Sequence, residues 1–75
     1  MNTEKIAKFI EARRRELGMT QKELASRLFV SSKTVSKWET GRGMPNISVL
    51  LDLSDALCVS VVELLSGERS GSMHQ

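Results

Sequence analysis

The chain has 75 residues, which limits it to a single domain with one modest hydrophobic core. Hydrophobic residues make up 40% and charged residues 27% of it, as in an ordinary globular domain. One Cys excludes an internal disulfide, and no apolar run is long enough to span a bilayer. We therefore expect a cytoplasmic protein with no metal or other cofactor, no membrane partner and no small-molecule substrate.

The charge is distributed unevenly along the chain. Residues 1–45 hold ten Lys and Arg against five Asp and Glu, a net of +5, whereas residues 46–75 have a net charge of −3. This asymmetry fits a protein with one side that faces nucleic acid, although a solvated helix face would look the same.

The first predicted element is a helix over residues 4–17, with Thr3 as its N-cap and Gly18 at its C-terminal end. Ile6, Ile10, Arg14 and Leu17 share one face at helical spacing. Arg14 should therefore point inward. Arg13 and Arg15 point in other directions and should be solvated or close to phosphate.

Two short helices follow. Thr20 and Glu23 form a capping box that begins a helix ending near Leu28. Ser31 is the expected N-cap of the next helix, which should run from Ser32 to about Thr40. The segment from residue 29 to 31 is too short to be anything but a turn, so residues 20–41 are predicted to form a helix-turn-helix.

The two sides of the helix after this turn differ in chemistry. Val35 and Trp38 fall on its inward face, and the indole is expected in the core rather than stacked on a base. The opposite side carries four hydrogen-bond donors and no carboxylate: Ser32, Lys33, Ser36 and Lys37. Such a surface suits phosphates and base edges. Glu39, near the negative end of the helix, needs a cation, and inward-pointing Arg14 is the expected partner.

The rest of the chain predicts two more helices. Asn46 should cap one in which Ile47, Leu50, Leu51, Ser54 and Leu57 recur at helical spacing, with Leu53 widening the face. Ser60 and Glu63 should open a short fifth helix that ends by Gly67. Cys58 is expected to be a small buried hydrophobe rather than a redox switch. Residues 68–75 should be a disordered tail after a domain of residues 1–67.

Three runs of residues resemble one family. They are T-Q-x-E-L-A at 20–25, S-x-x-T-V-S-K-W-E-x-G at 31–41 and V-S-V-x-x-L-L at 59–65. Together with the order of five helices over residues 4–67, they resemble the phage-repressor (Cro or xenobiotic-response-element) type of helix-turn-helix DNA-binding protein. The resemblance implies an all-α, five-helix, lambda-repressor-like fold that binds double-stranded DNA.

The resemblance also implies roles for single residues. Gln21 would bind a phosphate, Ser31 would cap the recognition helix and touch phosphate, and Arg42 would contact the DNA backbone. Ser32, Lys33 and Lys37 would reach base edges in the major groove. Ser36 is either a base contact or a solubilising residue. Many relatives form an internal salt bridge at the positions of Arg14 and Glu39.

Phe29 departs from the family pattern, in which Gly or Asn occupies a turn position that favours positive φ. Either the backbone is strained there or the turn is built differently. Packing of the Phe29 side chain over the first helix would offer compensation.

The resulting hypothesis is a sequence-specific transcriptional regulator, a repressor, that binds a palindromic operator as a homodimer. The loop 43–46 and the fifth helix are the expected dimer surface, with Val62 either exposed there or part of the core. The alternative is an antitoxin or protein-interaction module of the same fold, which steep salt dependence of duplex binding would argue against. An enzyme is not expected, because the sole His is His74 in the tail and no nucleophile–base pair is evident.

Overall fold

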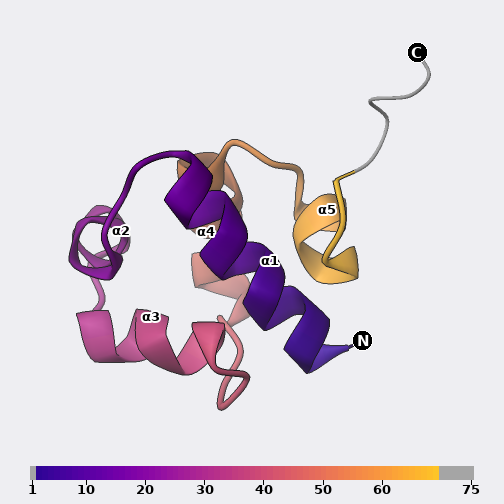
Figure 1. The fold of residues 1–75 in the computed structure, drawn as a ribbon. Helices are drawn as coiled ribbons and strands as arrows, with labels where there is room; N and C mark the ends of the chain where they lie inside the picture. Colours follow the sequence, from indigo (N-terminus) through magenta and orange to yellow (C-terminus); the bar gives the residue numbers. More distant parts are fainter. Residues whose placement is uncertain (1, 70–75) are drawn as a thin grey trace.

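Five helices and no strand make up residues 2–69, the part of the chain that this computed structural model describes. The helices are α1 (Thr3–Glu16), α2 (Gln21–Leu28), α3 (Ser32–Glu39), α4 (Ile47–Leu57) and α5 (Val61–Ser66). In Figure 1, α1 crosses in front of α4, α2 and α3 lie to its left and below, and α5 lies to its right. The all-α, five-helix prediction is confirmed. None of the described helices is long and apolar enough to cross a membrane.

A polar side chain caps the start of every helix. The N-caps are Asn2, Thr20, Ser31, Asn46 and Ser60. The capping boxes predicted for α2 and α5 are both present. The hydrogen bond from the Thr20 backbone N–H holds the pKa of Glu23 below its ordinary value. The prediction that Thr3 caps α1 is wrong, because the Asn2 side chain accepts the Lys5 N–H and the helix begins one residue earlier.

Each helix contributes at least one side chain to a single core. The largest side chains with almost no exposed surface are Ile6, Ile10, Leu24, Val35, Leu53, Leu57 and Leu64. Ala25 of α2 is also buried, and α2 packs against α3. This core fixes α3 by one side only, so its other side stays at the surface.

The inward face of α4 is narrower than the sequence pattern suggested. Leu53 and Leu57 are fully buried, but Ile47 is 82% exposed and Leu51 is 61% exposed. Apolar residues occupy so much of this helix that periodicity could not select the buried side. The contacts of α4 with α1, α2 and α5 select it instead.

Two non-glycine residues adopt the left-handed conformation at helix ends. Phe29, the C-cap of α2, has φ 57° and ψ 40°, and Cys58, the C-cap of α4, has φ 57° and ψ 45°. The turn is therefore strained at Phe29, and its side chain is 96% exposed rather than packed over α1. The expectation of a buried Cys58 is also wrong, because Cys58 is exposed at the end of α4.

The end of the described chain is tied to α1 and α5. Glu68 pairs with Lys5, and Arg69 pairs with Glu63. Gly67 lies so close to α1 that an added Cβ would stand 3.1 Å from backbone atoms of Lys5. The predicted disordered tail thus begins with two placed residues, and residues 70–75 lie outside the described part.

A buried ion pair joins α1 to the last residue of α3, as predicted. Arg14 donates from Nε to Glu39 Oε2 at 2.6 Å and from Nη2 to Oε1 at 2.9 Å, and its Nη1 donates to the Met19 carbonyl at 2.8 Å. The two side chains are 9% and 2% exposed. Hydrogen bonding to Glu39 raises the pKa of Arg14 above its ordinary value. The pair therefore fixes α3 against α1.

The strained turn yields a first prediction. Phe29→Gly should raise the free energy of unfolding by about 1 kcal/mol, because Gly adopts positive φ without the steric cost and no buried contact is lost. Urea unfolding followed by the fluorescence of buried Trp38 measures this. As a control, Ser26→Gly in the exposed middle of α2 should lower stability by roughly 0.5–1 kcal/mol. A lower stability for Phe29→Gly would contradict the strain.

The buried pair yields a second prediction. Arg14→Met should lower the free energy of unfolding by about 3–5 kcal/mol, because it leaves a carboxylate buried without its cation. The double variant Arg14→Met/Glu39→Leu should recover most of that loss, since it leaves no buried charge. The same urea titrations apply. A loss below about 1 kcal/mol for Arg14→Met would show that the pair does not fasten α1 to α3.

Candidate nucleic-acid interface

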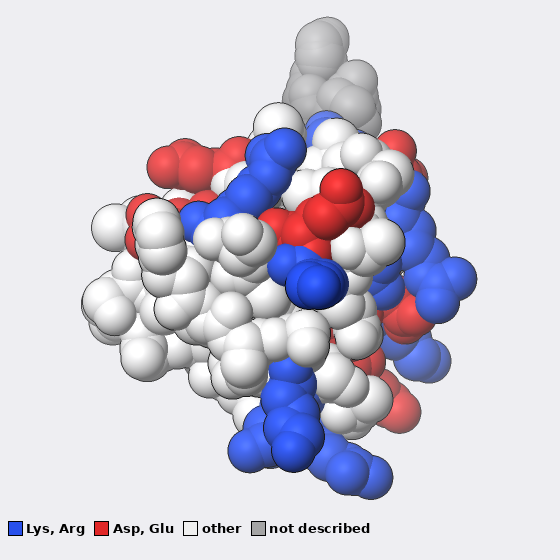
Figure 2. Space-filling model, turned by 90° about the vertical axis from the view of Figure 1, so that its left-hand side faces the viewer, with Lys and Arg blue, Asp and Glu red and all other residues white. Residues whose placement is uncertain are grey.

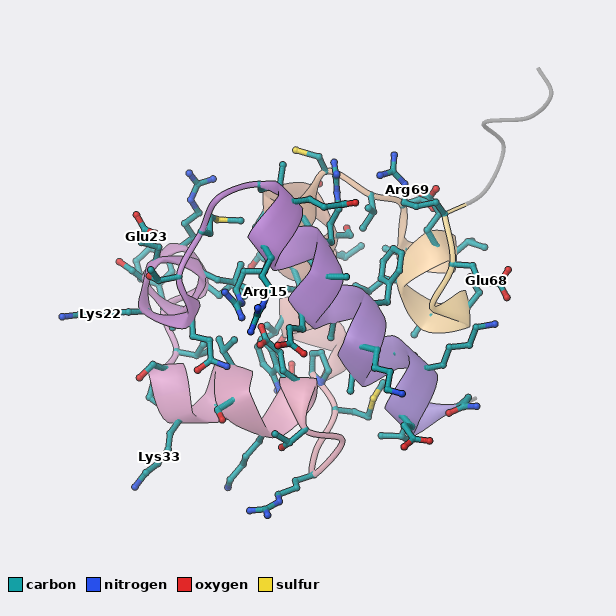
Figure 3. The ribbon with its side chains drawn as sticks, in the orientation of Figure 1. Arg15, Lys22, Glu23, Lys33, Glu68 and Arg69 are labelled. Carbon is teal, nitrogen blue, oxygen red and sulfur yellow. The ribbon has the colours of Figure 1, made fainter. Side chains whose placement is uncertain are left out.

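The exposed side of α3 is the basic surface that the sequence predicted. Ser32, Lys33 and Lys37 are exposed, and Ser36 is half-buried. Lys33 points away from the body of the protein, beyond the start of α3 (Figure 3). In the space-filling view, basic side chains gather at the lower edge, where α3 lies in Figure 1 (Figure 2). Backbone geometry and burial of the opposite side therefore leave these donors free to meet a partner.

The charge of this surface is not cancelled by neighbouring carboxylates. Among residues 2–69, no ion pair within 4.0 Å involves Lys33, Lys37 or Arg42. The only acidic residue of α3 is Glu39, whose side chain is buried. Three cations therefore remain available at one end of the molecule for phosphates or base edges.

Of the two arginines of α1 that were expected to be solvated or close to phosphate, Arg15 is exposed and Arg13 is not. Arg13 was predicted to be solvated or near phosphate, but it is only 17% exposed and its Nε donates to the Leu57 carbonyl at 2.8 Å. This bond ties α1 to the end of α4. Arg15 is exposed and pairs with Glu11 at 2.8 Å. Within the described part of the chain, four of the ten cations of residues 1–45 thus pair with carboxylates of the protein: Lys5, Arg13, Arg14 and Arg15.

Ser31 and Arg42 mark the two ends of α3. The Ser31 hydroxyl accepts the Thr34 N–H at 3.2 Å, which confirms its capping role and holds the oxygen at the helix start. Arg42 is exposed just beyond the end of α3, and its backbone N–H donates to the Lys37 carbonyl at 2.9 Å. This bond fixes the backbone at Arg42 against the end of α3.

Gln21 is placed as predicted, at the first position of α2, but it has a partner that sequence reasoning missed. Its Nε2 donates to Glu39 Oε1 at 3.0 Å, and the residue is half-buried. Nothing in the local pattern signals this bond, because the two residues are 18 apart in sequence. It follows only once the buried pair has brought α3 beside the start of α2.

Lys22 is a further exposed cation in the first turn of α2, which the sequence reasoning did not single out. Figure 3 shows it pointing outward from α2 in a different direction from Lys33. The two cations thus do not converge. Among the described residues there is also no group of three or more His, Cys, Asp or Glu side chains that could hold a metal ion.

Comparisons with known proteins agree with this geometry. Residues 10–64 match a helix-turn-helix family model. The transcriptional activator BcrR of Enterococcus faecalis is 47% identical over 51 residues, which are 68% of this chain and 25% of BcrR. The repressor protein C2 of Salmonella phage P22 is 40% identical over 70 residues, which are 93% of this chain and 32% of C2.

The same phage repressor is also a structural neighbour. The crystal structure of the P22 c2 repressor in complex with a synthetic operator has a TM-score of 0.81 and 38% identity, covering 84% of this chain and 96% of that one. The chain spans about a quarter of BcrR and a third of C2. With most of its length matched in both sequence and fold, the chain belongs to the helix-turn-helix family.

Proposed function

We propose that the chain binds double-stranded DNA in a sequence-specific manner and acts as a transcriptional regulator, with repression as its mode. The observation that carries the proposal is the exposed side of α3, which offers Ser32, Lys33 and Lys37 with no carboxylate among them. The operator-bound P22 c2 repressor, whose fold this chain shares, supports the assignment. The relatives are named as regulators, and the proposal gives the chain no catalytic role.

In this proposal α3 lies in the major groove with its N-terminal residues towards the bases. Lys33 is near the start of the helix and donates to guanine O6 and N7, while Lys37, one turn later, reaches a base or the flanking phosphate. Ser32 bonds a base edge, and half-buried Ser36 does so where the helix lies deep in the groove. Gln21, Ser31 and Arg42 contact the phosphate backbone on either side.

A dimer on a palindromic operator completes the proposal, because one recognition helix reads too few base pairs for specificity. Two half-sites about 34 Å apart would bind two copies. The proposed interface is the loop 43–46 with α5, where Val62 is 72% exposed. Ile47 and Leu51 of α4 are further exposed apolar residues. The proposal includes a location in the cytoplasm.

The proposal predicts different losses at Lys33 and Gln21. With a duplex selected from a random pool, Lys33→Ala should weaken binding by about 1–3 kcal/mol and relax the base preference at one position. Gln21→Ala should weaken binding to all sequences similarly, since phosphates carry no sequence information. Fluorescence anisotropy with the selected duplex and with single-base variants measures both.

Lys8→Ala is the matched control, because it removes one exposed cation from α1, outside the helix-turn-helix. It should lower affinity far less than Lys33→Ala. Equal affinity of the wild type and Lys33→Ala for the selected duplex would remove Lys33 from base reading.

A further inference from the structure

One oxygen of Glu39 joins the ends of two different helices. Oε1 accepts from Nη2 of Arg14 at 2.9 Å and from Nε2 of Gln21 at 3.0 Å. Glu39 is the last residue of α3 and Gln21 is the first residue of α2. The carboxylate therefore ties the start of α2 to the end of α3 through side chains, in addition to the apolar contacts between the helices.

This bond restrains the side chain at the start of α2. The Thr20 hydroxyl accepts the Glu23 N–H at 3.0 Å, and the backbone N–H groups of Gln21 and Lys22 have no acceptor within the helix. These N–H groups, with the second hydrogen of Gln21 Nε2, suit a phosphate. A free Gln side chain would lose its rotamer freedom on binding, whereas one already held by Glu39 loses less.

We propose that Glu39 is a positioning residue for DNA binding: by holding the Gln21 carboxamide, it prepares the start of α2 for a phosphate and fixes that contact relative to the recognition helix α3. The inference rests on the proposed function. It assigns Glu39, which is buried and cannot touch DNA, a role in affinity that is separate from its role in stability. A carboxylate is required, because three donors share its two oxygens.

A double-mutant cycle tests the proposal. Glu39→Gln replaces one carboxylate oxygen by a group that cannot accept, so Arg14 and Gln21 compete for the remaining oxygen. Affinity for the selected duplex is measured for wild type, Glu39→Gln, Gln21→Ala and the double variant, at a temperature where each is fully folded. Glu39→Gln should lower affinity roughly three- to tenfold in the wild type and have no further effect after Gln21→Ala.

Arg13→Lys is the matched control, because it removes a part-buried hydrogen bond to the Leu57 carbonyl, keeps the positive charge, and lies outside both the helix-turn-helix and the proposed dimer surface. It should lower the melting temperature without lowering affinity. Equal losses from Glu39→Gln in both backgrounds, or no loss in either, would overturn the positioning role while leaving DNA binding intact. Failure of the wild type to bind any duplex would overturn the proposed function together with this inference.

A measurement on the wild type covers the case in which Glu39→Gln does not fold. The ¹⁵N relaxation of the Gln21 side-chain amide should show a heteronuclear NOE close to that of the α2 backbone, and its signals should shift on addition of the duplex. An amide that averages freely in the unbound protein would show that Glu39 does not hold it. An amide that does not respond to the duplex would show that it makes no phosphate contact, and either result would overturn the positioning role.

Discussion

The structure depends on a buried carboxylate that three donors satisfy. Glu39 stands at the negative end of α3, where an acidic side chain is disfavoured, and it is almost fully buried. Arg14 from α1 and Gln21 from α2 donate hydrogen bonds to its two oxygens. These bonds offset the free-energy cost of burying the charge and the cost of placing it at the negative end of the helix. Because these donors come from different helices, satisfying one charge sets the relative placement of α1, α2 and α3.

This placement explains how so small a domain can present a rigid surface. The inward side of α3 is held by Val35 and Trp38 in the core, and its end is held by Glu39. The outward side has no internal partner for its lysines among residues 2–69. The proposed DNA contacts use the side chains of α3 that do not pack in the core. One side of the helix therefore stabilises the fold and, in this proposal, the opposite side recognises DNA.

The sequence predicted the features that follow local rules, and it failed where distant packing decides. Caps at Thr20, Ser31 and Asn46 and the spacing of buried residues identified five helices. The need of Glu39 for a cation even identified Arg14 across 25 residues. The bond between Arg13 and the Leu57 carbonyl was missed, because no pattern says which neighbour a helix face will meet.

The same division applies to the candidate site. Composition and spacing found the donors of α3, but the link between Gln21 and Glu39 required the folded arrangement. At Phe29 the family resemblance identified a position that favours positive φ, and the backbone adopts it with a side chain that gains no burial in return. The sequence therefore showed that Phe29 conflicts with a position that favours positive φ. It did not show that the backbone would accept the strain rather than form a different turn.

The central claim is that the outward side of α3 meets DNA. The most direct test is a titration of the ¹⁵N-labelled chain with a duplex recovered by selection from a random pool. The account predicts the largest backbone shifts at Ser32, Lys33, Lys37 and the first turn of α2, with binding that weakens steeply as salt is added. Shifts centred on α4 or α5 with no change in α3, or no binding in dilute buffer, would contradict it.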